Sequence, residues 1–105
     1  MGVLGLMNIT VLCAKACQLW GYQAQFYQAI EECAELIVAI NHFTRYKSSD
    51  NLRNVAEEIV DVEIMLEQLK YMLELPDSLY ESVRERKINR LKCLIAKDAL
   101  SKKVD

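Results

Sequence analysis

Two short acidic motifs hold the residues best suited to chemistry in this chain of 105 residues. Glu32 and Glu35 are three residues apart, and Glu58 and Asp61 repeat that spacing further along. Because residues three apart share a face of a helix, each motif presents two carboxylates in one direction. If the two helices pack antiparallel across a connector at residues 44–50, four carboxylates converge. Four neighbouring carboxylates repel one another and could not all stay ionised without a positive charge nearby, so the sequence predicts a bound cation.

The side-chain types indicate which cation. Carboxylate oxygens without sulfur or imidazole nitrogen nearby suit Mg²⁺ or Mn²⁺ better than zinc, copper or haem iron. The four cysteines and one histidine show no zinc-ligand spacing. A di-iron carboxylate bundle needs Glu-x-x-His on two helices. The only histidine, His42, is preceded three residues earlier by Ala39, so that alternative fails on the sequence.

Apolar periodicity predicts the elements that position these motifs. We expect an all-α fold, a bundle of about four helices in each chain. Gly21 separates the first helix from the second, and Pro76 ends the third helix. Ser78 and Glu81 have the spacing of a capping box for the fourth, which Asp77-Ser78 opens. The first three helices are expected over residues 10–20, 22–43 and 51–75.

Each long helix carries an apolar row expected to pack in the bundle, with the acids of the second helix on the opposite face. The row of the second helix is Tyr22, Phe26, Ile30, Cys33, Ile37 and Ile40. The row of the third is Leu52, Val55, Ile59, Val62, Leu66, Leu69 and Leu73. In the fourth, the residues expected to face inward are Leu79, Val83, Ile88, Leu91 and Ile95. Off the row of the third helix, a subunit interface is expected at Val60, Ile64 and Met65.

Composition predicts one domain over residues 1–105, with frayed ends at 1–7 and 101–105. The apolar fraction of 52% is high for a small monomer and favours a dimer or tetramer. The start of the chain lacks the basic and cleavage regions of a signal peptide, and no apolar run reaches membrane-spanning length. We therefore expect a cytoplasmic protein with reduced cysteines and no membrane partner. Residues 84–103 are basic but lack interleaved aromatics or a known motif, so no nucleic-acid partner is expected.

The acidic motifs and their neighbours resemble the MazG-like family of all-α nucleoside triphosphate pyrophosphohydrolases. The signature of that family is Glu-Glu-x-x-Glu followed, after a spacer, by Glu-x-x-Asp. Here Glu31-Glu32-Cys33-Ala34-Glu35 precedes Glu58-Ile59-Val60-Asp61 by twenty-two intervening residues. Trp20-Gly21 and Gln25 ahead of the first motif agree as well. The resemblance covers roughly residues 18–92.

The resemblance implies Mg²⁺-dependent hydrolysis of nucleoside or deoxynucleoside triphosphates to monophosphate and pyrophosphate, in a housecleaning role. It implies metal ligands at Glu32, Glu35, Glu58 and Asp61. The resemblance also implies that Glu31 is an auxiliary ligand or a base that orients water. It implies phosphate contacts at Lys87 and Arg90, and nucleoside contacts at Trp20, Gln25 and His42.

Each assignment has a plain alternative. The acids can form a solvated helix face, and Glu57 is expected to face solvent or pair with a basic residue. Lys87 and Arg90 can be ordinary surface charges, while a lone Trp or His can be structural. The alternative function is a non-catalytic helical module, used for oligomerisation or regulation, whose acidic site has decayed. Such a module would show no thermal shift with Mg²⁺.

Overall fold

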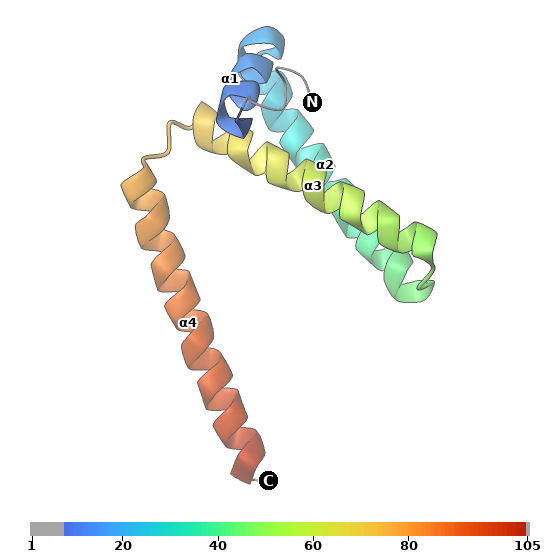
Figure 1. Ribbon diagram of the computed structural model, residues 1–105, viewed down its shortest axis with the longest axis vertical. Coiled ribbons are helices and arrows are strands. Elements are labelled where there is room, and N and C mark those ends of the chain that lie inside the picture. Colours follow the sequence, from blue (N-terminus) through green and yellow to red (C-terminus); the bar gives the residue numbers. More distant parts are fainter. Residues whose placement is uncertain (1–7, 105) are drawn as a thin grey trace. The chain divides into compact units, whose positions relative to one another are not determined.

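The computed structural model describes residues 8–104, and every regular element in that range is a helix. The helices are α1 (Ile9–Trp20), α2 (Tyr22–Arg45), α3 (Ser49–Met72) and α4 (Asp77–Val104) (Figure 1). The predicted all-α class is therefore confirmed. Residues 1–7, which were expected to fray, and residue 105 lie outside the described residues. Of the other end expected to fray, residues 101–104 are helical, because α4 continues to Val104.

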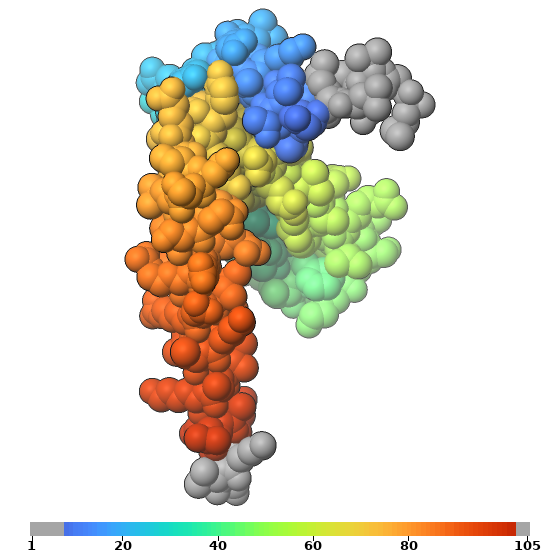
Figure 2. Space-filling view, turned by 60° about the vertical axis from the view of Figure 1, so that its left-hand side comes forward, coloured from blue at the N-terminus to red at the C-terminus, as the bar shows by residue number. Residues whose placement is uncertain are grey.

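The chain divides into two compact units, one up to Glu74 and one from Leu75 onward. In the first unit α2 and α3 form an antiparallel hairpin, and α1 packs mainly against α3 (Figure 1). The space-filling view shows side chains of α1, in blue, against those of α3, in yellow (Figure 2). The second unit is α4. Within residues 8–104, no helix has the length and apolarity needed to cross a membrane.

Local signals fix the connections within the first unit. The Asn8 side chain accepts a hydrogen bond from the Val11 N–H at 2.9 Å and caps α1. Gly21 joins α1 to α2 with a φ of 91°, a backbone conformation that other residues rarely adopt. Ser48 caps α3 by accepting from the Asn51 N–H at 3.1 Å. The connector is therefore shorter than expected, because both flanking helices extend into residues 44–50.

The end of α3 differs from the sequence prediction. The helix ends at Met72 rather than running to Pro76, and Glu74 takes a left-handed φ of 49°. Pro76 disfavours the helical region only for Leu75. The Glu74 N–H donates to the Tyr71 carbonyl at 3.1 Å, so the chain already turns out of the helix at Glu74. The Tyr80 N–H donates to the Pro76 carbonyl at 3.0 Å, which closes the first turn of α4. Ser78 thus lies inside α4, and the predicted capping box was wrong.

The core is built from small and flexible side chains. No Leu, Ile, Val or Phe in the part of the chain with described side chains is buried. The buried apolar residues are Cys13, Cys17, Ala29, Ala39, Met65 and Met72. Two glutamines, Gln25 and Gln68, are buried with them. Such small side chains allow α2 and α3 to approach closely.

The predicted apolar rows of the two long helices are largely exposed, which corrects the expectation that they pack inward. In α2, Ile30 and Ile37 are 66% and 61% exposed, while the opposite, acid-bearing face packs against α3. In α3, Val55, Val62 and Leu69 are half-buried, but the rest of the row is exposed: Leu52, Ile59, Leu66 and Leu73. A periodic row of apolar residues shows which residues share one face of a helix, but it does not show which other element packs against that face.

The expected subunit interface off the α3 row also changes. Met65 is buried inside the three-helix unit, and Ile64 is half-buried. Val60 is exposed. In α4, the expected inward residues are half-buried at Val83 and Ile88 and exposed at Leu79, Leu91 and Ile95.

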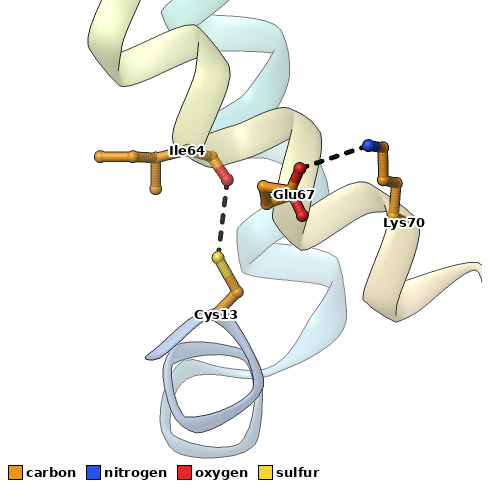
Figure 3. A network of polar contacts seen from close by, with 4 residues as sticks. All are labelled: Cys13, Ile64, Glu67 and Lys70. Atoms are coloured by element: carbon orange, nitrogen blue, oxygen red, sulfur yellow. Dashed lines mark hydrogen bonds and ion pairs between the residues drawn. The ribbon is translucent and has the colours of Figure 1, made fainter. Parts of the chain in front are cut away.

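Two cysteine thiols of α1 donate hydrogen bonds to α3. The Cys13 thiol donates to the Ile64 carbonyl at 3.7 Å, close to the Glu67–Lys70 ion pair of 3.2 Å (Figure 3). One turn further, the Cys17 thiol donates to Gln68 Oε1 at 3.9 Å. Burial raises the pKa of both thiols, so both stay protonated and serve as packing groups.

Candidate metal centre

Three carboxylates meet where α2 and α3 pack together. Glu32 on α2 and Glu58 and Asp61 on α3 each offer an oxygen atom, and the three oxygens lie within 4.8 Å of one another. The spacing of three residues places Glu58 and Asp61 on one side of α3. Packing of the acid-bearing face of α2 then brings Glu32 to them. The structure therefore brings together three of the four acids predicted as metal ligands.

Glu35, the fourth, lies outside this group of three and is exposed. Its charge still reaches the group, because it contributes to raising the pKa of both Glu32 and Glu58. Glu35 and Glu58 also line the same groove. The Glu35 carboxylate therefore lies beside the group of three.

The centre contains hydrogen-bonding capacity that the protein leaves unused. Glu32 Oε1 accepts from Gln28 Nε2 at 2.7 Å. Glu32 Oε2 and Glu58 Oε2, in contrast, are buried and have no hydrogen-bond partner among the described residues. A buried acceptor without a donor carries the full cost of its lost hydration. Either a proton or a cation would remove that cost.

The carboxyl groups resist ionisation here. Burial is the main cause that raises the pKa of Glu32, and the charges of Glu35 and Asp61 add to it, while the Gln28 amide lowers it. Burial also leads in raising the pKa of Glu58, followed by the charges of Glu35, Glu32 and Asp61. Crowded carboxylates with raised pKa values are stabilised in the charged form by a nearby positive ion.

The donor set fits a hard divalent cation. All three converging groups are carboxylates, and two of them have an oxygen without a partner. Oxygen-only coordination suits Mg²⁺ and Mn²⁺, which keep some water ligands of their own. Glu32, Glu58 and Asp61 would hold such an ion, with Glu35 close enough in the sequence and on the surface to join them.

A groove of about 260 Å³ opens beside the centre. It is lined by Glu35, Val38, Ala39 and His42 of α2 and by Asn54 and Glu58 of α3. His42, a predicted nucleoside contact, thus shares a groove with an acid of the centre. Asn54 was missed by the sequence reasoning, although its position four residues before Glu58 places both on one helix face.

A second hollow, of about 320 Å³, lies on the surface of α3 beside Asp61. Glu57 lines it together with Ala56 and Val60. Glu57 is exposed and does not belong to the carboxylate group, in keeping with its expected position in solvent.

The remaining predicted site residues do not belong to the group of three carboxylates. Glu31 is exposed on α2, and Trp20, at the end of α1, is 62% exposed. Gln25 is buried in the three-helix unit, so a nucleoside contact would require it to leave the core. Lys87 and Arg90 are exposed on α4, in the second unit.

The chain has no match among known proteins: no family model, no curated protein and no solved structure is similar to it. What supports a function is therefore the pair of acidic motifs and the geometry in which α2 and α3 hold them.

Proposed function

We propose that this chain is a Mg²⁺-dependent nucleoside triphosphate pyrophosphohydrolase of the MazG-like type. It converts nucleoside or deoxynucleoside triphosphates to monophosphate and pyrophosphate, as a housecleaning enzyme of the cytoplasmic nucleotide pool. The observation that carries the proposal is the convergence of Glu32, Glu58 and Asp61 from two helices within 4.8 Å. The order of the two acidic motifs supports the reaction class.

Each acid has a role in the proposal. Glu32, Glu58 and Asp61 hold the ion, and Glu35 completes the set from the adjoining groove. Bound Mg²⁺ supplies charge neutralisation on the phosphate oxygens and a water of lowered pKa. Glu31 lies four residues before Glu35 and shares its helix face, where a carboxylate orients the attacking water.

The substrate contacts follow from the groove and the basic residues. The groove lined by His42 and Asn54 takes the nucleoside, with a ring available for stacking and an amide that both donates and accepts hydrogen bonds. Trp20 and His42 lie near opposite ends of α2, about 30 Å apart, so Trp20 is not a contact of this groove within one chain. Lys87 and Arg90 neutralise the triphosphate, for which guanidinium and ammonium groups are well suited.

The test is a substrate panel. The full chain is incubated with the common ribonucleoside and deoxynucleoside triphosphates and Mg²⁺, and released pyrophosphate and monophosphate are measured. We expect both products in equal amounts from at least one substrate, and none when EDTA replaces Mg²⁺. A helical sample that releases no pyrophosphate from any of them contradicts the enzyme. If Mg²⁺ also fails to raise the melting temperature, a non-catalytic helical module explains the chain better.

A further inference from the structure

The groove beside the carboxylate centre offers few polar groups to a ligand. It is lined by two acids, Glu35 and Glu58, by His42 and Asn54, and by two apolar residues. Ionised carboxylates accept hydrogen bonds but do not donate them, and apolar side chains do neither. Asn54 therefore supplies the one side-chain amide among the residues that line this groove.

The order of these residues along the groove follows from the rise of the helices. The ends of α2 and α3 are level where they meet the connector, residues 46–48. At about 1.5 Å per residue, His42 lies about 4.5 Å from that level and Asn54 about 7.5 Å. Glu58 lies about 13.5 Å from it, and Glu35 about 15 Å. Asn54 is therefore between the acids and the histidine, about 6 Å from Glu58 along the helix axis.

The parts of a nucleoside triphosphate follow one another in the same order. The triphosphate is attached to the sugar, and the sugar is attached to the base. When the phosphates bind a cation held by the carboxylate centre, the sugar comes next along the groove and the base lies farthest from the acids. The sugar is then level with Asn54, and the base is level with His42.

The Asn54 amide is available to a ligand. It is exposed, and its side chain makes no hydrogen bond to another described residue. Asn51, three residues earlier on α3, differs because its Nδ2 donates to the Tyr46 carbonyl at 2.8 Å. An amide can donate one hydrogen bond and accept another, and a sugar hydroxyl can also do both. Asn54 and a hydroxyl group are therefore matched partners.

We propose that Asn54 binds a hydroxyl group of the substrate's sugar and makes the enzyme prefer nucleotides that carry a hydroxyl to dideoxynucleotides. The inference rests on the proposed function, since it places the phosphates at the carboxylate centre. It assigns sugar recognition to α3 and base contact to α2, where the His42 ring can stack on any base. The two contacts are therefore separable by mutation.

The expected preference is that of one hydrogen bond. Because Asn54 is exposed, a substrate without the hydroxyl leaves the amide in water rather than buried and unpaired. A hydrogen bond of this kind corresponds to about a tenfold difference in affinity. Much larger ratios arise only where the polar group of the site is buried.

The experiment compares three sugar forms of each common base. The full chain is given Mg²⁺ and the ribonucleoside, 2′-deoxynucleoside or 2′,3′-dideoxynucleoside triphosphate. The readout is kcat/KM for pyrophosphate release, or the dissociation constant from calorimetry for a triphosphate that is not hydrolysed. In the wild type we expect the dideoxy form to be about tenfold weaker than the better of the other two.

Three variants locate the preference. Asn54→Ala should make the three sugar forms equal, and it should fold, because alanine favours a helix more than asparagine does. Asn51→Ala is the matched control: the same substitution on the same helix, at an amide already bound to the connector, should keep the wild-type ratio. His42→Ala should weaken all three forms by the same factor, since its ring contacts the base. Circular dichroism verifies that the variants remain helical.

Three results overturn the inference. They are a wild type that treats the three sugar forms alike, an Asn54→Ala variant that keeps the wild-type ratio, and an Asn51→Ala variant that loses it as well. If pyrophosphate is still released, each of them leaves the proposed function intact. Hydroxyl-dependent binding that Asn54→Ala abolishes, without any release of pyrophosphate, supports the inference and contradicts the proposed activity. Failure to bind any of the triphosphates contradicts both.

Discussion

Where α2 and α3 meet, carboxylate oxygens are buried without a hydrogen-bond donor; on an outer side of the hairpin, large aliphatic side chains are exposed to water. Both arrangements carry a cost in the isolated chain, one from lost hydration and one from exposed apolar surface. A small cation relieves the first cost, whereas only an apolar surface relieves the second. The two regions of one hairpin thus differ in what would stabilise them.

The way the two helices face each other explains how both can exist. Ala29 and Ala39 of α2 are buried, and Glu32 of the same helix meets the acids of α3. Ile30 and Ile37 lie on another face of α2, so the packing that gathers the acids leaves them exposed.

The largest expected effect is loss of turnover on the acidic side. Asp61→Asn or Glu58→Gln removes a charged metal ligand, so kcat/KM for pyrophosphate release should fall at least about 100-fold, the upper range for losing an outer-shell partner. Glu57→Gln, an equal charge change outside the carboxylate group, should keep nearly full activity. Equal losses of kcat/KM in all three variants would mean that turnover depends on the overall negative charge and not on metal ligation by these residues.

The next prediction contrasts a buried residue with its exposed neighbour. Met65→Ala removes a core side chain and should lower the free energy of unfolding by about 2–5 kcal/mol. Leu66→Ala, at the neighbouring residue that is already 47% exposed, should lower it by only about 0.5 kcal/mol. Urea unfolding measures both variants, and equal losses would contradict the burial of Met65.

A smaller effect should come from the group that supports Glu32. The Gln28 amide lowers the pKa of Glu32, so Gln28→Leu should leave that carboxyl harder to ionise. We expect Mg²⁺ affinity to fall about tenfold, as for other groups that orient a ligand. Gln23 lies five residues earlier on α2 and makes the same kind of contact, but to the Tyr27 hydroxyl, so Gln23→Leu is the matched control. Calorimetric titration decides, and equal affinities for both variants would remove Gln28 from the centre.

The smallest predicted effect is a pH dependence of stability. The raised pKa values of Glu32 and Glu58 mean that the folded, metal-free protein keeps protons that the unfolded chain has already released. Its stability should therefore be greatest below the ordinary glutamate pKa and fall as pH rises through the raised values. Mg²⁺ should oppose this fall, since it binds the ionised carboxylates. Melting temperatures in EDTA and in Mg²⁺ test this, and metal-free stability that increases over the window contradicts it.

Much of the fold could be predicted from the sequence because its signals are local. Apolar periodicity indicated the helices, and Gly21 indicated the break after α1. The end of α3 could not be placed well, since the chain leaves the helix through the left-handed Glu74 before Pro76 acts. Asn54 was missed because a single polar residue in a helix carries no signal until a groove forms around it.

The sequence by itself determined which residues share a helix face, because that depends only on the 3.6-residue turn. It therefore predicted that Glu58 and Asp61 lie together and that each long helix has an apolar row. Only the tertiary structure decided which faces meet. Close packing through Ala29 and Ala39 turned Glu32 toward the acids of α3 and left the apolar rows outside, since the choice between faces depends on how closely two helices can approach.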